Sequence, residues 1–446
     1  MSSTPSPTHG AIEAVWRIEA GKIVAGVARL VRDVGLAEEL AQDALVAALE
    51  HWPRDGIPDN PGAWLMTTAK RRALDHLRLH ALHARKHEEL GLDLEAQQAH
   101  VVPDFSDALD AARQDDIGDD LLRLIFTACH PLLSTEARAA LTLRLLGGLS
   151  TEEIARAFLL PEPTIAQRIV RAKRTLSAAK VPFEVPRGDE RLARLGSVLE
   201  VIYLIFNEGY AATAGEHWLR PALCDEALRL ARTLAGLMPQ DPEVLGLQAL
   251  LEIQASRLHA RIDAQGRPVL LADQDRTRWD ALLIQRGLAA LARAVALAAM
   301  PGARQQAPGK GSQERAPSAL GPYALQAAIA ACHARARSVA DTDWAQIVAL
   351  YDALAQLAPS PVIALNRAVA VGMAFGPAAA LELVDALGAD PALRNYPWLP
   401  AVRGDLLGKL GRHAQARAEF ERAAGLTQNE RDRSLLLERA RGDDPR

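Results

Sequence analysis

The segment from Ser150 to Leu176 has the pattern of two short helices joined by a tight turn. Ser150 with Glu153 three residues later is the capping-box arrangement that begins a helix. Residues 159–162 form the predicted turn, and Pro163 suits the first position of a second helix because proline has no amide hydrogen to donate. This arrangement predicts a helix-turn-helix, a unit with which proteins bind duplex DNA.

The second predicted helix has one apolar face and one basic face. Its apolar residues recur at spacings of four, three and four, and they are Ile165, Ile169, Ala172 and Leu176. The side chains left outside are Thr164, Gln167, Arg168, Arg171, Lys173 and Arg174. This face favours contact with phosphates and base edges, since residues 161–180 contain five basic residues and one acidic in a chain of net charge −4. The alternative interpretation is an amphipathic helix pair whose basic face is only solvated.

The composition predicts an all-α protein. Of the residues, 49% are hydrophobic but only 4% are aromatic, and alternating β-branched runs are scarce. A length of 446 residues is enough for two or three domains. No stretch of about 20 apolar residues is free of charge, so we expect no membrane span. The three cysteines, Cys129, Cys224 and Cys332, are widely spaced, which predicts buried free thiols in a reducing cytoplasm and neither disulfides nor a zinc site.

Charge and turn residues divide the chain into segments. From residue 88 to residue 120 there are eleven acidic residues and one basic, which is typical of a solvated connector. The predicted organisation is a disordered tail (1–10), a first helical domain (11–87), an acidic linker (88–116), the helix-turn-helix domain (117–180) and a C-terminal helical domain (181–446) with a flexible loop (304–318).

The C-terminal segment has a pattern of helix pairs with short loops. Between residues 400 and 426 small and apolar residues have the offsets of a tetratricopeptide unit; they are Gly404, Leu407, Gly411, Ala416, Phe420 and Ala423. A weaker copy spans residues 361–387, and its Ala380 lies 36 residues before Ala416. The usual repeat is about 34 residues long, so the pattern predicts a helical-repeat domain.

Several long stretches resemble regions two and four of extracytoplasmic-function sigma factors. They are VGLAEELAQDALVAALE, NPGAWLMTTAKRRALDHLR and LTLRLLGGLSTEEIARAFLLPEPTIAQRIVRAKRTL. The sequences QDRTRWD, GPYALQAAIAACHA, LYDAL and SPVIALNRAVAV resemble the group with a C-terminal tetratricopeptide-like extension. The loop 304–318 looks like an insertion relative to that group, and the last helix pair lacks the proline that often closes a tetratricopeptide unit.

The resemblance implies a bacterial cytoplasmic transcription factor that is not an enzyme and needs no cofactor or metal. Its partners would be core RNA polymerase and promoter DNA. The implied polymerase contacts are Glu39, Gln42 and Asp43, and the implied −10 contacts are Trp52, Asn60, Lys70, Arg71 and Arg72. The basic residues of the second helix, with Thr164 and Gln167, would read the −35 element. The loop from residue 52 to residue 61 would hold a flipped base, and the acidic linker would follow the RNA channel of the polymerase.

Other interpretations stay open from the residues themselves. The charged faces could be solvated only, and Trp64 fits a core position better than a base-stacking one. His76, His80, His83 and His87 would line one helix face, which suits a metal site, pH sensing or a plain polar stripe that faces the linker. A conventional DNA-binding activator and a repeat-based scaffold are the competing functions. In a sigma factor, the C-terminal domain would regulate the sigma domains in cis or bind a regulatory protein.

Overall fold

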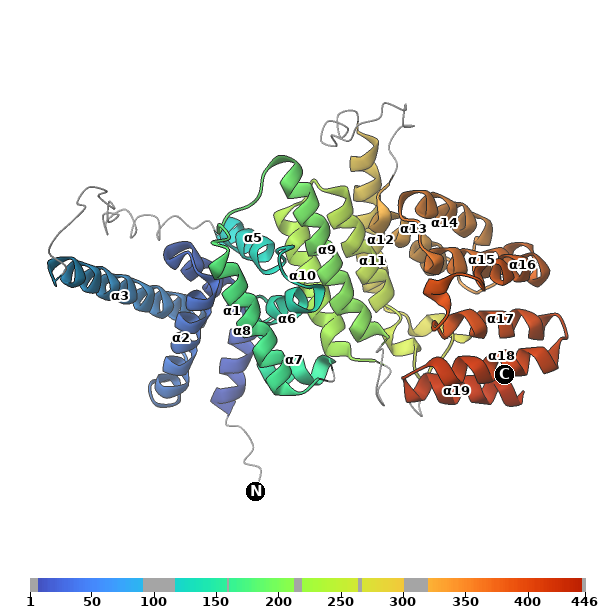
Figure 1. The fold of residues 1–446 in the computed structure, drawn as a ribbon, viewed down its shortest axis with the longest axis horizontal. Helices are drawn as coiled ribbons and strands as arrows, with labels where there is room; N and C mark the ends of the chain where they lie inside the picture. Colours follow the sequence, from blue (N-terminus) through green and yellow to red (C-terminus); the bar gives the residue numbers. More distant parts are fainter. Residues whose placement is uncertain are drawn as a thin grey trace, which may run out of the picture. The chain divides into compact units, whose positions relative to one another are not determined.

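The computed structural model describes residues 7–90, 117–158, 160–211, 219–263, 267–300 and 320–442. Their regular structure is helical (Figure 1), and extended pairing among them is confined to one isolated bridge between Ile262 and Pro268. The prediction of an all-α chain is confirmed. The chain divides into two compact units, Met1–Val201 (unit 1) and Ile202–Arg446 (unit 2), which are described separately below.

Unit 1 begins with three long helices, α1 (Pro7–Val31), α2 (Val34–Asp55) and α3 (Pro61–Leu90). Alanines fill much of their interface, including Ala25, Ala28 and Ala41, which are fully buried. Small side chains let helix backbones approach closely, so an alanine-rich sequence with few aromatic residues can still form a dense core. The first helix begins at Pro7, inside the segment predicted as a tail, so the prediction for residues 1–10 was too long.

The second helix extends further than its sequence suggested. It runs through Pro53 to Asp55 and ends where Gly56, at a φ of 87°, donates its amide to the Trp52 carbonyl at 3.1 Å. Proline in the interior of a helix removes one backbone hydrogen bond, but in the last turn that loss is tolerated. The predicted loop from residue 52 to residue 61 therefore shortens, and Trp52 is part of a helix.

Four helices form the second half of unit 1: α5 (Ile117–Ala128), α6 (Thr135–Leu145), α7 (Thr151–Phe158) and α8 (Glu162–Ala178). The α6 helix begins at its Ser134 cap, whose hydroxyl accepts the Ala137 amide at 3.3 Å. The α8 helix begins one residue before Pro163, with Pro161 at the cap position. The four apolar residues predicted to form its inner stripe are all buried.

The boundary between the units lies inside α9 (Gly188–Tyr210), beyond residue 181 where the sequence placed it. Ser197 donates its hydroxyl to the Cys129 carbonyl at 2.6 Å, and Arg194 donates to the Phe126 carbonyl at 3.2 Å. These bonds attach the first half of α9 to the end of α5. A shortened protein that keeps unit 1 intact must therefore include residues up to Val201.

Unit 2 continues from α9 with ten α-helices and four short 3₁₀ turns among its described residues. The α-helices are α10 (Pro221–Leu237), α11 (Pro242–Ala255), α12 (Ala281–Ala299), α13 (Pro322–Arg335), α14 (Trp344–Leu357), α15 (Pro361–Phe375), α16 (Pro377–Leu387), α17 (Trp398–Lys409), α18 (His413–Leu426) and α19 (Glu430–Arg441). The 3₁₀ turns are η1 (Leu258–Ala260), η2 (Leu271–Asp273), η3 (Arg276–Arg278) and η4 (Pro391–Leu393).

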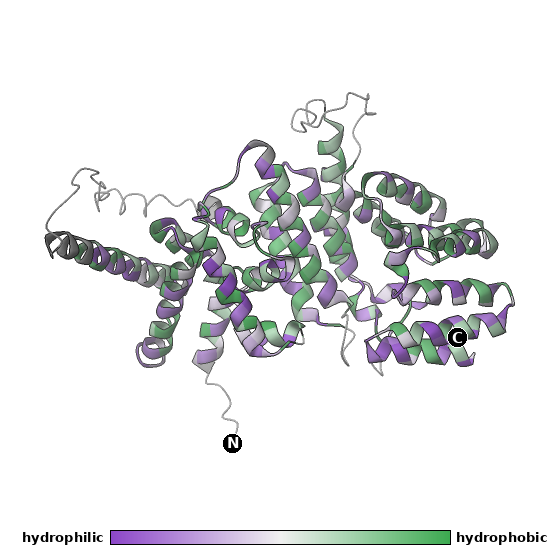
Figure 2. Ribbon diagram, in the orientation of Figure 1, coloured by the Kyte–Doolittle hydropathy of each residue, from purple (hydrophilic) through white to green (hydrophobic). Residues whose placement is uncertain are grey.

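Helices of unit 2 pack mainly with their neighbours in sequence. Figure 2 shows α11 as apolar along most of its length, and α18 and α19 as more hydrophilic. Gly246 of α11 lies so near α13 that an added Cβ would meet the Ala324 amide nitrogen at 2.6 Å. In the α17–α18 pair, a Cβ on Gly404 would meet the Phe420 ring at 3.1 Å, which explains why the pattern places glycine there.

One described helix, α12, is long and apolar enough to cross a membrane by length and composition alone. It carries Arg286 and Arg293, and its buried residues, Gly287, Ala290, Leu291 and Ala294, are confined to one face. Leu291 and Ala290 belong to one core cluster with Leu250 of α11 and Ala327 of α13. The acidic linker from residue 91 onward and the loop 304–318 lie outside the described residues.

Candidate nucleic-acid interface

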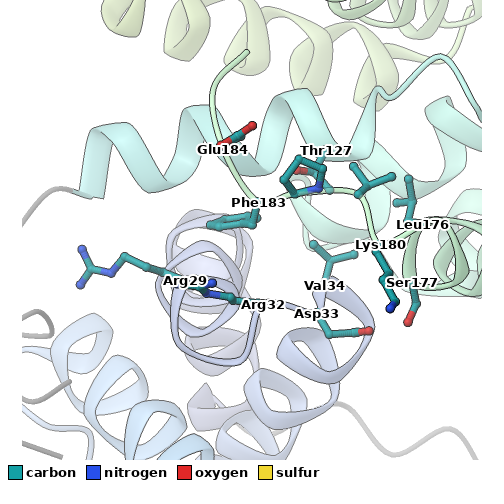
Figure 3. A pocket seen from close by; sticks show the side chains of 12 residues that line it. Arg29, Arg32, Asp33, Val34, Thr127, Leu176, Ser177, Lys180, Phe183 and Glu184 are labelled. Carbon is teal, nitrogen blue, oxygen red and sulfur yellow. The ribbon is translucent and has the colours of Figure 1, made fainter. Parts of the chain in front are cut away.

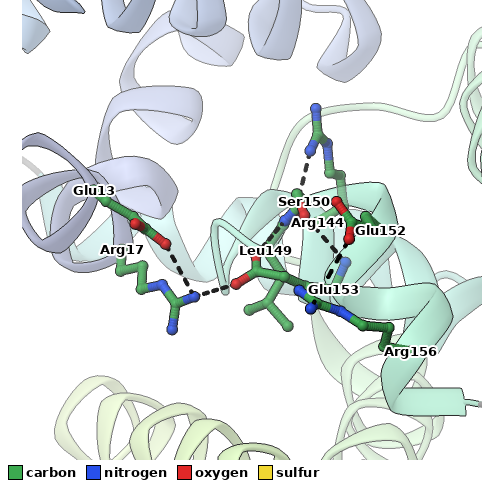
Figure 4. A network of polar contacts seen from close by, with 8 residues as sticks. All are labelled: Glu13, Arg17, Arg144, Leu149, Ser150, Glu152, Glu153 and Arg156. Atoms are coloured by element: carbon green, nitrogen blue, oxygen red, sulfur yellow. Dashed lines mark hydrogen bonds and ion pairs between the residues drawn. The ribbon is translucent and has the colours of Figure 1, made fainter. Parts of the chain in front are cut away.

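The helix-turn-helix has the local geometry that its sequence predicts. Ser150 donates its amide to the Glu153 carboxylate at 2.8 Å, and Glu153 donates its amide to the Ser150 hydroxyl at 3.1 Å. This reciprocal pair is a complete capping box at the start of α7. Figure 4 shows the same Glu153 carboxylate paired with Arg17 of α1. The cap therefore also connects α7 to the first helix of the chain.

The outer face of α8 is accessible over most of its length. Thr164, Gln167, Arg171 and Arg174 are exposed, and Arg168 is half-buried. Arg168 lies near Glu136 of α6, where a backbone hydrogen bond, the Ser134 side chain and the positive charge together lower the pKa of the Glu136 carboxyl. Four of the six side chains predicted to read DNA therefore lie together on one exposed surface.

Among the six side chains predicted to read DNA, Lys173 differs because it pairs with another helix of unit 1. Its ammonium group pairs with the carboxylate of Glu38 in α2, and its side chain is only 20% exposed. Arg144 of α6 donates its Nε to the same carboxylate at 2.5 Å. Glu38 itself is 3% exposed. In this conformation Lys173 is not available to DNA, because a buried carboxylate holds it.

The sequence around Glu38 indicates that its side chain lies on the buried face of α2. Val34 and Ala41, four residues before and three residues after it, are both buried, so helical periodicity places Glu38 on the same inner face. A carboxylate on an inner face requires cationic partners, and the sequence does not show which cations those are. Arg144, which no pattern singled out, is one of them.

The residues predicted to contact polymerase lie on the remaining surface of α2. Glu39 and Asp43 are exposed, and Asp43 pairs with Arg72 of α3 at 3.3 Å. Gln42 is half-buried and donates its amide to Glu38 at 2.5 Å. Glu39 and Asp43 are accessible to a partner, whereas Gln42 supports the buried carboxylate.

The residues predicted to contact the −10 element have mixed positions. Trp52 is 2% exposed, and its ring meets the edge of the Trp64 ring with centroids 5.5 Å apart. A buried ring cannot stack on a base in this conformation. Trp64, which we expected in the core, is half-buried. Arg71 is exposed and Lys70 is half-buried, and Asn60 accepts the Ala63 amide at 3.1 Å as the cap of α3.

A cavity of about 540 Å³ lies within unit 1, where the end of α1 and the start of α2 meet α5 and the end of α8. Figure 3 shows Arg29, Arg32 and Lys180 around it, with Asp33 and Glu184 as the acidic residues. Asp120 of α5 is buried at the nearby contact between helices and pairs with Arg29 at 3.3 Å and Arg123 at 2.6 Å. Ion pairs also connect α1 with α7, and α2 with α6 and α8.

The cysteines and the described histidines of the two units were the other candidates for chemistry. All three thiols are free and buried, as predicted, and burial raises the pKa of Cys129 to about 11 and that of Cys224 to about 12. The rings of His76 and His80 are 4.8 Å apart, while the side chains of His83 and His87 lie outside the described residues. Over the described ranges, no group of three or more His, Cys, Asp or Glu side chains could hold a metal ion.

Comparison with known proteins decides the family. Residues 18–82 match Sigma-70 region 2, and residues 123–176 match Sigma-70 region 4. The chain is 30% identical over 154 residues to the ECF RNA polymerase sigma factor SigK of Mycobacterium ulcerans, spanning 34% of this chain and 75% of that protein. The chain belongs to the ECF sigma factor family. A probable ECF sigma factor, SigI of Mycobacterium tuberculosis, is 24% identical over 267 residues, 52% of this chain and 88% of that protein.

The matched regions of this sigma factor contain every predicted site residue. Region 2 includes the predicted polymerase and −10 residues of α2 and α3, and region 4 includes α7 and nearly all of α8. Residues 194–295 match a family of unknown function, DUF6596, which runs from α9 to α12. An uncharacterized protein of Rhizobium meliloti is 44% identical over 402 residues, 90% of this chain and 88% of that protein, so the helical extension also occurs there.

Proposed function

We propose that this sigma factor reads the −35 element with α8 and the −10 element with the end of α2 and the start of α3. The observation that carries the proposal is the exposed surface of α8, with Gln167, Arg171 and Arg174 on a capped helix-turn-helix. The second helix of such a motif enters the major groove, where arginine and glutamine side chains reach base edges.

Some of the −10 contacts would be made to the DNA backbone and others to a base. Arg71 and Lys70 on α3 supply positive charge for phosphates, and Asn60 lies at the cap of α3 beside the short loop 56–60. The buried ring of Trp52 packs against the ring of Trp64, so it would stabilise this loop through apolar packing. A flipped base would then be held by the loop itself, and Trp52 would contact the base only after a local movement.

The described conformation of unit 1 would be a closed one. Two promoter elements about 25 base pairs apart are separated by about 85 Å along B-form DNA, at 3.4 Å per base pair. Regions 2 and 4 cannot reach both elements while Glu38 of α2 holds Arg144 and Lys173 of region 4. Engagement of polymerase at Glu39 and Asp43, on the same helix as Glu38, would favour separation of the two regions.

The C-terminal unit would regulate this opening in cis or bind a regulatory protein. Its succession of helix pairs supports a tetratricopeptide-like description, with Ala380, Ala416 and Phe420 buried at the offsets of the repeat. Repeat surfaces of this kind bind peptides and neighbouring domains. Helices α9–α12, which match the family of unknown function, would connect this surface to the sigma regions.

Run-off transcription with bacterial core polymerase tests the proposal. The full chain and a chain ending at Val201 would be compared on DNA from upstream of the gene that encodes the protein. We expect specific initiation with the full chain, and the difference between the two proteins gives the sign of regulation by unit 2. Binding of core polymerase in the absence of DNA separates a sigma factor from an ordinary activator. A full chain that bound promoter DNA but not polymerase would refute the proposal.

A further inference from the structure

A second cavity, of about 300 Å³, is lined entirely by residues of unit 2. It is enclosed by the η2 and η3 turns and by residues of α13, α14, α15, α17 and α19. Arg276 of the QDRTRWD sequence is one of its lining residues. A sequence outside the predicted promoter and polymerase contacts therefore contributes to the wall of a cavity.

The walls of this cavity are largely apolar and partly aromatic. Trp344 and Trp398 line it in a chain that has only seven tryptophans, so aromatic surface is concentrated there. Val369 and Met373 of α15 also line it and are 37% and 36% exposed. Exposed apolar side chains beside a cavity with a few polar groups are the usual composition of a small-molecule site.

The charged groups of the lining have an excess of positive charge. Three cations, Arg276, Lys409 and Arg439, face one carboxylate, that of Asp405. Lys409 pairs with Asp405 at 2.9 Å and Arg439 pairs with the same carboxylate. Although burial raises the pKa of Asp405, these two cations hold it below its ordinary value. Because these two cations share one carboxylate, the lining keeps one positive charge in excess at this point.

Arg276 is the third cation of the lining, and it lies near the carboxylate of Asp341, whose negative charge partly opposes the lowering of its pKa. Its guanidinium donates to the carbonyls of His333 and Ala336 and to the Thr342 hydroxyl, all of which are neutral acceptors. Burial and the charge of Arg257 lower the pKa of Arg276. His333, 8% exposed, lines the cavity as well, and its Nδ1 is buried without a hydrogen-bond partner in the part of the chain that the structure describes.

We propose that this cavity binds a small organic anion, with an apolar body against Trp344 and Trp398 and an acidic group near Arg276 and Arg439. The apolar walls supply the free energy of binding by burial, and the excess cations select a negative charge. Sulfonates and carboxylates share this chemistry. The proposal concerns unit 2 alone and does not depend on the assignment of promoter contacts.

Fluorescence titration of the full chain with 8-anilinonaphthalene-1-sulfonate tests this site, because that probe combines an aromatic body with an anionic group. We expect saturable binding at one site, displacement by octanoate, and much weaker displacement by octanol, which has the same apolar chain without the charge. Probe binding that octanol reverses as well as octanoate does would overturn the requirement for an anion. No saturable binding would overturn the site itself.

Two substitutions locate the probe in the cavity. Lys409→Gln removes a half-exposed cation that pairs with Asp405, so it lowers the excess of positive charge in the lining and should weaken probe binding about tenfold. Val369→Asp places a negative charge on the partly exposed apolar wall and should abolish binding, with an unchanged circular-dichroism melting curve. Arg417→Gln is the matched control, because Arg417 is an exposed α18 cation that does not line the cavity. Full probe affinity in Val369→Asp would refute the location.

Discussion

The carboxylate of Glu38 in region 2 holds the ammonium of Lys173 in region 4, although the two residues are far apart in the sequence. Glu38 is almost completely buried, and Arg144 is its second cationic partner. A carboxylate in such a place is stable only while its partners remain. The pair therefore links the position of a predicted DNA-reading helix to a helix predicted to bind polymerase.

Glu38→Gln should loosen the contact between the two regions. Loss of a buried charge that leaves two cations unpaired costs about 3 kcal/mol, which corresponds to about a hundredfold faster exchange by local opening. Hydrogen–deuterium exchange of the α8 amides measures this directly. Glu39→Gln is the control, because the neighbouring Glu39 is exposed and its loss should leave α8 exchange unchanged. Equal protection in both variants would show that the Glu38 contact does not hold α8.

Arg171→Ala should weaken binding to the −35 element. Loss of an arginine that contacts a base edge costs about 1–3 kcal/mol. Loss of one that contacts only phosphate weakens binding to all sequences alike and lowers the salt dependence by about one charge. Titration of duplex DNA at several salt concentrations distinguishes the two outcomes. Arg394→Ala, which removes an exposed arginine of unit 2, should leave both quantities unchanged. Wild-type affinity and salt dependence for Arg171→Ala would remove this residue from the interface.

Asn60→Ala should destabilise the start of α3. Its side-chain oxygen accepts the Ala63 amide, and loss of such a cap costs about 1 kcal/mol. Asn60→Asp keeps the accepting oxygen and should keep the stability. If Asn60 also contacts the −10 element, both variants should reduce promoter opening, which permanganate reactivity of unpaired thymines detects. A melting temperature unaffected by Asn60→Ala would contradict the capping role.

The stability of the protein should fall as the pH is lowered below neutrality, because of His333. Burial, and then the charges of Arg257 and Arg276, lower the pKa of His333 to about 4. The unfolded chain binds the proton near pH 6.5, so this contribution is fully present above that pH and is lost as the pH falls toward about 4. Between pH 7 and pH 5 the loss is about 2 kcal/mol.

Urea unfolding of the full chain at the two pH values measures this loss. His333→Gln should reduce the difference between them, whereas the exposed His413→Gln should not. An identical pH dependence in His333→Gln and the unsubstituted protein would show that His333 is not the responsible group.

Local patterns were sufficient to predict most of the helices and the helix-turn-helix. The capping box of Ser150 and Glu153 and the buried stripe from Ile165 to Leu176 involve residues close in sequence, and both are present in the structure. The end of α2 was not predictable in the same way, because Pro53 is a residue type that usually ends a helix. In the structure α2 continues past Trp52 to Asp55, and the Trp52 ring packs against Trp64 of α3.

What the sequence by itself determined was the helical class, the region 2 and region 4 signatures and the faces of individual helices, because these depend on neighbours within about one turn. Tertiary structure alone decided which polar residues are available. Gln42 and Lys173 were predicted as contact residues on helix faces, and Trp52 as a contact residue of the loop 52–61. Each is engaged by a different part of the chain or by a buried neighbour. Their availability depends on long-range contacts, and local periodicity contains no information about the partner across an interface.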